Sequence, residues 1–352
     1  MTPRHAFADG YEISRIIKGG WHLAGGHGAV DPERAVEDMA AFVEAGITTF
    51  DCADIYTGVE ALIGRFRRAH PQLARRVQVH TKFVPDLPDL ESVDGRYVER
   101  IVDRSLARLG VERLDLVQFH WWDFAVPRHV EVALELDRLR RAGKIAHIGA
   151  TNFDVPRLAQ IVAAGVPVVA HQVQYSLLDD RPARRMTDYC RAHGIALLCY
   201  GTVAGGFLSE RWLGRPDPVD SAANRSLVKY RLIIEDFGGW ALFQELLEAL
   251  RGIAERHQCD IATVATVAIL ERAQVAAAIV GATSAAHLPA HRRAAAVRLD
   301  DADRAAIAAV TDRRRGPAGD VYELERDREG RHGRIMKYAL NADGGEKSAG
   351  SA

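Results

Sequence analysis

Six short apolar runs in this sequence end in polar residues that together could carry acid–base chemistry. A strand-end Asp or Thr often caps the following helix, and a lone His is more often a hydrogen-bonded core residue, so each ending taken alone has a structural explanation. Together they supply an acid, a base, a cation and amides, which capping explains poorly. We therefore expect the following residues to converge on one site: Asp51, Lys82, His120, Thr151 with Asn152, Gln172, and Tyr200.

The elements that must position these residues alternate between short β-branched runs and helical stretches. One helical stretch begins where Asp31 caps Pro32 and ends at Gly46, and Gly110 and Gly143 occupy the same stop position in later repeats. Strands that alternate with helices indicate βαβ units in a parallel sheet. Eight such strands close a (β/α)8 barrel, whose site forms at the C-terminal strand ends. The predicted strands are residues 13–21, 47–51, 77–83, 114–120, 144–151, 168–175, 195–201 and 276–283.

The competing architecture is an open doubly wound sheet. Such a sheet should carry G-x-G-x-x-G between its first strand and the helix that follows. No predicted strand here is followed by that pattern, and Gly25, Gly26 and Gly28 have the wrong spacing and precede Asp31. The sequence therefore favours the α/β fold of the TIM barrel type.

The layout of the chain follows from this assignment. We predict a single barrel domain over residues 1–340, with its core at 11–312. An N-terminal lead-in precedes the barrel, and a C-terminal extension covers 313–340. A long insertion follows the seventh strand, with a loop at 212–220, a loop between Tyr230 and Trp240, and helices near 240–257 and 261–272. The tail, 341–352, is rich in Gly, Ser and Ala and is predicted to be disordered.

Composition excludes several classes of protein. The 46 basic and 47 acidic residues nearly cancel, which argues against nucleic-acid or membrane binding and favours a small-molecule partner. The N-terminal residues lack a signal-peptide pattern and no run is long enough to span a membrane, so we expect a cytoplasmic protein. The four cysteines lie far apart, and no metal site is expected. Composition does not distinguish a monomer from a homo-oligomer.

The stretch GITTFDCADIYTGVEALIG (46–64) resembles the signature of the aldo-keto reductase family, in which a Tyr follows an Asp by five residues. The resemblance continues, in the family's order, through TKF, DLVQFHWW, GKIAHIGATNF, QVQYSLL, CYGTVAGGFLS and IVGATSAAHL, and it spans roughly residues 11–312. It implies that Tyr56 gives a proton to a substrate carbonyl, and that Asp51, Lys82 and His120 complete a catalytic tetrad.

Physical chemistry supports these roles. A phenol with a pKa near 10 is a poor acid at neutral pH, and a nearby ammonium lowers that pKa by favouring the phenolate. Lys82 can supply the charge, and Asp51 can keep Lys82 protonated and aimed. A neutral His120 can donate a hydrogen bond to the carbonyl oxygen and polarise it.

The resemblance also implies a nicotinamide cofactor. Thr151, Asn152 and Gln172 match the positions that bind the carboxamide, and Tyr175 matches the aromatic residue that stacks on the ring. The loop after the seventh strand would follow the pyrophosphate, where glycines permit close approach. The segment after the last strand would hold the adenosine phosphate at the start of a helix. The residues of these two segments are Tyr200, Gly201, Gly205, Gly206 and Leu208, then Gly281, Thr283, Ser284, His287 and Arg292.

The phosphate segment departs from the common family pattern. Members that select the 2′-phosphate often carry a Lys-Ser pair with a later Arg, whereas this chain has Gly281-Ala282 and His287. Ser284, Arg292 and Arg293 favour NADP (NADPH), while NAD is possible because the arginines could equally form a solvated helix face. His287 and a second His four residues later lack a third ligand, which makes a metal site improbable.

Aromatic residues near the strand ends suggest a substrate pocket. Trp21, Trp121 and Trp122 could form its walls, which would suit a sugar face, an aromatic aldehyde or a ketone. The segment 316–338 goes beyond the family core. Its mixed charges favour a solvated surface. Alternatively it crosses the barrel mouth and brings Arg328, Arg331 or Lys337 to an anionic group.

The leading hypothesis is an NADP-dependent oxidoreductase that interconverts a carbonyl and an alcohol. The alternative is a nicotinamide-binding regulatory or sensor subunit with negligible turnover, because the family includes subunits of that kind. Hydrolase classes are excluded, since the sequence has no G-x-S-x-G elbow, no H-E-x-x-H helix and no P-loop.

Overall fold

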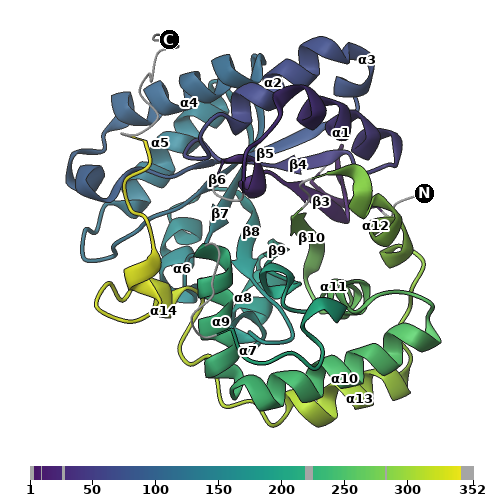
Figure 1. Cartoon of the computed structure of the whole chain (residues 1–352). Coiled ribbons are helices and arrows are strands. Elements are labelled where there is room, and N and C mark those ends of the chain that lie inside the picture. Colours follow the sequence, from purple (N-terminus) through teal and green to yellow (C-terminus); the bar gives the residue numbers. More distant parts are fainter. Residues whose placement is uncertain (1–3, 9, 26–27, 219–224, 282–283, 342–352) are drawn as a thin grey trace, which may run out of the picture.

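Eight parallel strands close into a barrel in the computed structural model of the chain, which confirms the predicted fold (Figure 1). The structure describes residues 4–8, 10–25, 28–218, 225–281 and 284–341. The strand order is β10-β3-β4-β5-β6-β7-β8-β9, with parallel pairing throughout. The bounds are β3 (Ile16–Gly19), β4 (Thr49–Asp51), β5 (Gln78–Phe83), β6 (Leu114–Phe119), β7 (Ile145–Thr151), β8 (Val168–Gln174), β9 (Ala196–Tyr200) and β10 (Val275–Gly281).

The predicted first strand, 13–21, is wrong as a single element. Its first part belongs to a hairpin of β1 (Arg4–Ala8) and β2 (Tyr11–Ser14), and only β3 enters the barrel. The chain turns at Ser14, whose hydroxyl donates to the Ile16 carbonyl oxygen (2.7 Å) and accepts from the Thr49 N–H (3.1 Å). The hairpin closes one end of the barrel, where Ile13 joins the interior apolar cluster.

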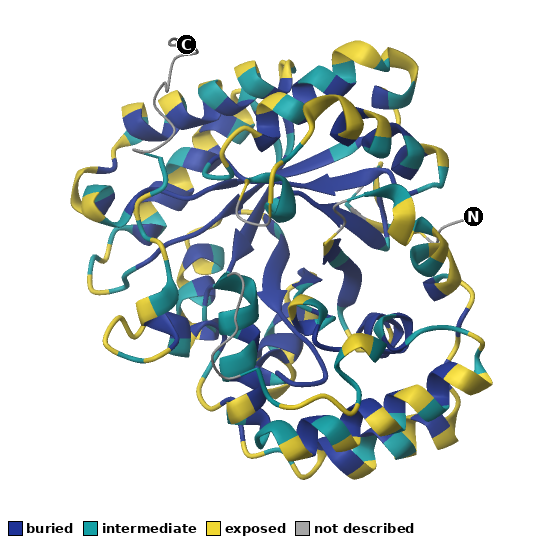
Figure 2. Cartoon of the chain, in the orientation of Figure 1, coloured by how far each residue is buried: buried dark blue, intermediate teal, exposed yellow. Residues whose placement is uncertain are grey.

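Helices surround the barrel, and most of them bury one face, as Figure 2 shows by their alternating colours. Asp31 caps the first one, accepting from the N–H groups of Glu33 and Arg34, and Gly110 ends another at φ 67°, as predicted. A large apolar cluster fills the layer between helices and strands, and a smaller one fills the barrel. The helices of this layer include α1 (Pro32–Glu44), α2 (Val59–Ala69), α4 (Gly95–Leu109), α5 (His129–Arg141), α6 (Val155–Ala163), α8 (Met186–Ala192) and α11 (Ile261–Leu270).

The insertion between β9 and β10 contains one helix more than predicted. The predicted helices near 240–257 and 261–272 correspond to α10 (Trp240–Arg256) and α11. The additional helix, α9 (Arg225–Phe237), was interpreted from the sequence as part of a loop. Its residues Tyr230, Ile233 and Phe237 are buried, so α9 packs on the barrel as part of the wall beside the mouth.

The C-terminal extension returns along one side of the barrel, beside α9, as the yellow segment of Figure 1. It contains the short helix α14 (Glu323–Arg326) and the turn η6 (Gly333–Ile335). Two anchors lie beyond α14: His332 Nε2 is 2.7 Å from Asp236 Oδ2, and the N–H groups of Leu340 and Asn341 donate to Asp86 Oδ1 at 2.9 and 3.0 Å. The extension is therefore tied to both sides of the mouth.

The predicted disordered tail begins at Asn341. The backbone N–H of Asn341 donates to Asp86, and residues 342–352 lie outside the described residues.

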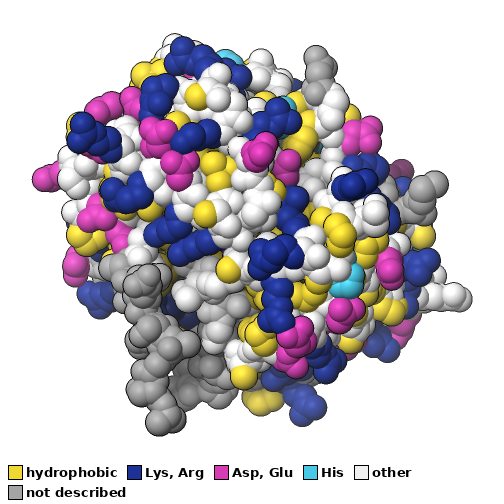
Figure 3. All heavy atoms as spheres, turned by 90° about the horizontal axis from the view of Figure 1, so that it is seen from above, with side chains coloured by type: hydrophobic (Ala, Val, Ile, Leu, Met, Phe, Trp, Pro, Cys, Tyr) yellow, Lys and Arg dark blue, Asp and Glu magenta, His cyan; other side chains and the backbone are white. Residues whose placement is uncertain are grey.

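Within the described ranges, no helix is long and apolar enough to span a membrane. Basic and acidic side chains are interspersed on the face shown in Figure 3.

Three buried histidines make the fold sensitive to acid. His80, His120 and His171 are at most 2% exposed, and burial, with nearby cations, lowers the pKa of each from 6.5 to about 3. Between these pH values the unfolded chain binds more protons than the folded one. Stability that is present above pH ~6.5 is therefore lost as the pH falls, by about 1.4 kcal/mol per pH unit for each histidine.

Urea unfolding at about pH 7.5, 6 and 5 tests this prediction. We expect the free energy of unfolding to fall steeply over this range. The variant His171→Gln, which removes one of the three groups, should show a shallower slope. A free energy of unfolding that is the same at pH 7.5 and 5 would contradict the assignment.

Candidate active site

The four residues of the predicted tetrad meet at the C-terminal end of the barrel. Successive residues of a strand alternate sides, so the register of β4, β5 and β6 directs Asp51, Lys82 and His120 inward. The Lys82 ammonium donates to Asp51 Oδ2 (2.7 Å) and to the Cys52 carbonyl oxygen (2.8 Å). It lies 5.1 Å from the centre of the Tyr56 ring. The structure thus brings together four residues from the ends of three different strands.

A pair of glutamines supports this arrangement from inside the barrel. Gln118 donates to Asp51 Oδ1 at 3.0 Å, and Gln172 donates to the same oxygen at 2.6 Å and to Gln118 Oε1 at 2.9 Å. Asp51 therefore accepts from three nitrogen groups and is held in one orientation. The role of Gln118 was not predicted from the sequence. Its position two residues before His120, on the same face of the strand, could have indicated it. The amide nitrogen of Gln172, assigned to the cofactor, is committed to the tetrad instead.

Electrostatics at the tetrad follow from burial and one ion pair. Burial would lower the pKa of Lys82, but Asp51 and Tyr56 raise it above its ordinary value, so Lys82 is a permanent cation. Burial raises the pKa of Tyr56, and the ammonium of Lys82 opposes that shift. Lys82 therefore lowers the pKa of Tyr56, as predicted. This lowering is smaller than the rise caused by burial.

The hydrogen bond that His120 makes changes its predicted role. Its Nδ1 lies 3.2 Å from the Thr151 carbonyl oxygen, which can only accept, so Nδ1 carries the proton. Burial, together with Arg326 and Lys82, lowers the pKa of His120 to about 3, and the ring is neutral. Its Nε2 is therefore an acceptor. The predicted role, in which a neutral His120 donates to the substrate carbonyl, requires the other tautomer and stays a prediction.

Tyr200 and Asn152 form the part of the mouth next to β7 and β9. The Tyr200 hydroxyl donates to Asn152 Oδ1 (2.9 Å), and Asn152 has a positive φ of 62°. Thr151 is buried and supplies the carbonyl that orients His120.

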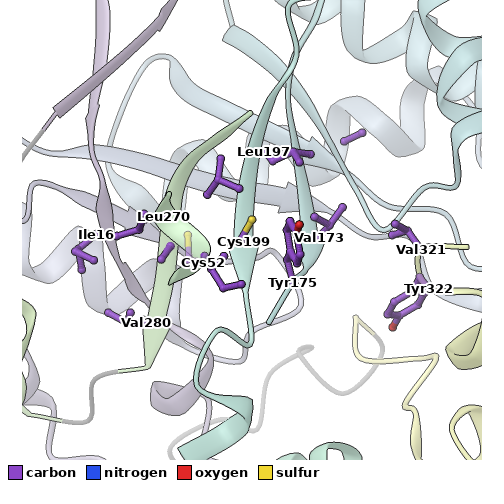
Figure 4. Packing of buried hydrophobic residues seen from close by; sticks show 14 of the residues in the cluster. Ile16, Cys52, Val173, Tyr175, Leu197, Cys199, Leu270, Val280, Val321 and Tyr322 are labelled. Carbon is purple, nitrogen blue, oxygen red and sulfur yellow. The ribbon is translucent and has the colours of Figure 1, made fainter. Parts of the chain in front are cut away.

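The assignment of Tyr175 as the stacking aromatic residue is wrong. It is 3% exposed and lies among Val173, Leu197 and Cys199 in the apolar layer outside the barrel (Figure 4). Of the two tyrosines assigned to the cofactor, Tyr200, on the inward side of β9, is the one that can present an aromatic face to a ligand at the mouth.

The loop after β9 has a shape that only glycine permits. Gly201, Gly205 and Gly206 have positive φ of 74°, 63° and 97°. A Cβ atom at Gly201 or Gly205 would come within 2.6 Å of the Tyr230 side chain of α9. Thr202 Oγ1 is buried without a hydrogen-bond partner. Leu208 is fully buried, so only its backbone can face a ligand.

The segment after β10 is partly occupied by the protein's own groups. Ser284 accepts from the Ala286 N–H, and the Ala285 N–H donates to Asp38 of α1 at 3.0 Å. His287 is exposed. Thr283 lies outside the described residues. A side chain at Gly281 would clash with the His22 ring, because its Cβ atom would lie 2.2 Å from it.

The two arginines of α12 (Leu288–Ala294) point to different neighbours. Arg292 is exposed and lines a surface hollow between α1 and α12 that includes Glu44 and Ala45. Arg293 lies 3.8 Å from Asp260, which caps α11, and its side chain is 49% exposed. Of the two, Arg293 is the one beside a neighbouring helix start.

The three tryptophans proposed as substrate walls have different positions. Trp21 is half-buried and packs against Tyr56, with ring centres 5.1 Å apart. Trp122 packs against His120 at 4.3 Å. Trp121 does not fit the prediction, because it is fully buried and its indole N–H donates to the Val126 carbonyl oxygen. Trp121 lies just after β6, next to the inward-facing His120, and it points outward into the core.

The C-terminal extension contributes residues that the sequence did not single out. Arg326 donates to the carbonyl oxygens of Asn152 (2.8 Å) and Trp121 (2.9 Å). Tyr322 packs edge-on against His120 at 5.5 Å, with a φ of 60°. As in the alternative, the extension reaches the barrel mouth. It does so through Tyr322 and Arg326 rather than through the residues that were predicted. Arg328, Arg331 and Lys337 are exposed, and the first two pair with surface carboxylates.

Beside the extension lies a buried cluster of charges. Arg181 donates to both carboxylate oxygens of Glu325 (3.0 and 3.1 Å) and to Asp179 (2.7 Å). Lys229 of α9 lies 3.9 Å from Glu325, and its ammonium lies 5.1 to 5.7 Å from the ring centres of three tyrosines. These tyrosines are Tyr200, Tyr230 and Tyr322. The cluster therefore links the barrel, α9 and the extension.

A closed parallel barrel with an Asp–Lys ion pair, a tyrosine and a histidine at its mouth defines a class of barrel oxidoreductases. The chain belongs to the aldo/keto reductase family, whose model matches residues 15–312.

The chain is also similar in sequence to individual proteins. The chain is 25% identical over 312 residues to NADH-specific methylglyoxal reductase from Escherichia coli, covering 83% of this chain and 92% of that protein. It is 34% identical over 251 residues to flagellar radial spoke protein 5 from Chlamydomonas reinhardtii, covering 60% of this chain and 47% of that protein. The chain thus spans about half the length of the radial spoke protein.

A solved structure shares the fold. The glycerol dehydrogenase AKR11B4 from Gluconobacter oxydans superposes with a TM-score of 0.72, at 22% identity, covering 88% of this chain and 95% of that chain.

Proposed function

We propose that this protein reduces an aldehyde or ketone to an alcohol, or catalyses the reverse reaction, with NAD(P)H as the hydride donor. The observation that carries the proposal is the position of Lys82, between the Asp51 carboxylate at 2.7 Å and the Tyr56 ring at 5.1 Å. A permanent ammonium beside a phenol stabilises the phenolate that remains after proton transfer. A tyrosine that acts as the general acid in carbonyl reduction requires such a stabilised phenolate.

The residues at the mouth fit a nicotinamide dinucleotide. Tyr200 offers an aromatic face, Asn152 an amide, and Thr202 a buried hydroxyl without a partner. Gly201 and Gly205 keep the adjoining backbone free of side chains. When bound, the reduced nicotinamide supplies a hydride to the carbonyl carbon.

The remaining steps belong to the chain's own residues. Tyr56 holds the carbonyl oxygen and gives it a proton as negative charge develops there. Lys82 keeps the resulting phenolate paired, and Asp51, fixed by Gln118 and Gln172, keeps Lys82 in place. Since Asp51 and Lys82 are buried with the two glutamines, their interactions are stronger than they would be at the surface.

The preference for NADPH over NADH is part of the proposal and rests on Ser284, Arg292 and Arg293. Arg293→Ala is expected to weaken NADPH binding about tenfold, because a charged hydrogen bond to phosphate is lost, and to leave NADH binding unchanged. Fluorescence titration with both cofactors measures this. Arg313→Ala, exposed and distant on the surface, is the control. Equal affinity of the wild type for both cofactors would contradict the preference.

A second candidate is a nicotinamide-binding regulatory or sensor subunit with negligible turnover. The similarity to a radial spoke protein favours it, because that relative is named for an assembly rather than for a reaction. The two candidates differ in one measurement. Tight cofactor binding without turnover on any short aldehyde, ketone or sugar supports the sensor, and turnover supports the enzyme.

A further inference from the structure

A second hollow, here called the floor hollow, lies at the hairpin end of the barrel, opposite the mouth. Its volume is about 430 Å³, which is within the range of small-molecule sites. It lies where β6 and β7 begin, whereas His120 and Thr151 lie at the other ends of the same strands. Its polar lining comes from the hairpin turn, β6, β7 and the end of α5, and includes Tyr11, Arg113, Asp115, Arg140 and His147.

Three side chains that line the floor hollow can carry positive charge. They are Arg113, Arg140 and His147. The side chains of Arg113 and His147 form no hydrogen bond or ion pair with any residue that the structure describes. Arg140 donates through Nε to Asp137 at 2.7 Å, and its two terminal nitrogens donate to no described residue. Several guanidinium N–H groups are therefore available to an anion, and their planar fork matches the oxygens of a phosphate group.

The two arginines act on the histidine between the strands. Burial lowers the pKa of His147, and the nearby charges of Arg113 and Arg140 lower it further. The arginines thus oppose a third positive charge in the floor hollow. A bound anion would offset their charge and favour the protonated imidazole. Binding of an anion and protonation of His147 are therefore expected to support each other.

One carboxylate lines the floor hollow, and groups outside the hollow hold it. Asp115 Oδ2 accepts from the Val79 N–H at 2.8 Å and lies 4.0 Å from Arg67. Asp137 in turn balances Arg140. The charge of the other lining arginine is left without a paired carboxylate, so the hollow as a whole favours an anion.

An uncharged aromatic floor lies below these cations. The rings of Tyr11 and His147 have their centres 4.5 Å apart, and the Tyr11 hydroxyl lies 2.9 Å from His80 Nε2. Burial raises the pKa of Tyr11 and lowers that of His80 to about 3, so both side chains are neutral near pH 7. A hollow of this size holds more than a phosphate ion, and an aromatic floor suits an attached organic group.

We infer that the floor hollow binds a small phosphate ester, a site separate from the barrel mouth. Arg113 and Arg140 bind the phosphate oxygens, His147 donates to them as the imidazolium, and the organic group packs on the Tyr11 ring. The ligand joins the hairpin, α5, β6 and β7. It therefore stabilises the folded barrel, because only the folded chain brings these elements together.

Calorimetric titration with inorganic phosphate and with phenyl phosphate tests the inference, at an ionic strength held constant with chloride. We expect saturable binding of phosphate with a Kd of about 1 mM or tighter, and several-fold tighter binding of phenyl phosphate. Arg113→Gln and Arg140→Gln should each weaken binding about tenfold, because each removes charged hydrogen bonds. The matched control is Arg141→Gln. Arg141 also pairs with Asp137, at 3.1 Å, but does not line the hollow, so its loss should leave the Kd unchanged.

The protonation of His147 provides a second readout. Its ring signal in an NMR titration is identified by its absence in His147→Gln. Saturating phosphate should raise the pKa of His147, because the anion stabilises the imidazolium, while chloride at equal ionic strength should not. A pKa that phosphate leaves unchanged would show that the anion does not bind beside this residue.

Other outcomes also overturn the inference. They include absence of saturable binding, and binding that Arg141→Gln weakens as much as Arg113→Gln does. Binding that Arg293→Ala weakens and Arg113→Gln leaves unchanged would place the phosphate at the proposed cofactor site instead. Equal affinity for phosphate and phenyl phosphate would exclude an ester as the ligand. Circular dichroism of each variant reports whether it is folded, and none of these outcomes bears on the oxidoreductase proposal.

Discussion

Tyr56→Phe is expected to lower kcat by about 10²- to 10⁴-fold, the usual contribution of a positioned general acid. The substitution removes one hydroxyl group and keeps the ring that packs on Trp21 at 5.1 Å. The proton that the carbonyl oxygen requires must then come from water. Cofactor affinity should stay within about twofold of the wild type, because the cofactor residues proposed above do not include Tyr56.

Steady-state kinetics together with cofactor titration measure both expectations. Tyr189→Phe, on α8 and away from the mouth, removes the same atom and is the matched control. It should have wild-type kcat. A Tyr56→Phe protein that keeps a tenth or more of the wild-type kcat would exclude Tyr56 as the proton donor.

Glu325→Ala is expected to have the largest effect on stability, at about 3 to 5 kcal/mol. Glu325 is 1% exposed and accepts from Arg181 twice, with Lys229 at 3.9 Å. Its removal leaves two cations in a buried region with only one carboxylate, Asp179, to pair them. Because Arg181 and Lys229 outweigh the effect of burial, the pKa of Glu325 is about 2. The stabilisation is therefore present above pH ~4.5 and lost as the pH falls towards 2.

Urea unfolding near neutral pH measures the loss of stability. The control is Glu329→Ala, whose side chain is 92% exposed and pairs with Arg334 at 3.8 Å. It should change stability by no more than about 0.5 kcal/mol. A Glu325→Ala protein as stable as the Glu329→Ala protein would show that the extension is not anchored by this cluster. Since Arg326 follows Glu325 directly, release of this anchor should also lower kcat/KM.

Much of the barrel and the tetrad could be predicted from the sequence, because both depend on local pattern. The apolar runs locate the barrel strands, and a polar residue at the end of a run faces the mouth when strand alternation directs it inward. The same alternation explains the error at Tyr175. Gln172 points into the barrel, so the residue three positions later points out. The prediction that Trp121 forms a substrate wall is wrong for the same reason. Its neighbour His120 points inward, so Trp121 points outward.

Other parts of the site depend on contacts between distant residues and left no local pattern. The tautomer of His120 is fixed by the Thr151 carbonyl oxygen, 31 residues away. Arg326 reaches the backbone of Asn152 across 174 residues, and Arg181 pairs with Glu325 across 144. In the sequence, 316–338 has the mixed charges of a solvated surface. The sequence does not distinguish Glu325 and Arg326 from exposed neighbours such as Arg328. In the fold, Glu325 is buried and Arg326 contacts the backbone at the mouth.

The proposed reaction at the barrel mouth is hydride transfer from a bound reduced nicotinamide to a carbonyl. The most direct test mixes the protein with a stoichiometric amount of NADPH, and in parallel NADH, and an excess of 2-hydroxypropanal. Nicotinamide oxidation and alcohol formation are then followed together. We predict one alcohol formed for each cofactor oxidised, with a rate that falls in Tyr56→Phe. A cofactor that binds tightly and stays reduced with this aldehyde and with a panel of sugars and ketones would contradict the claim and favour the sensor.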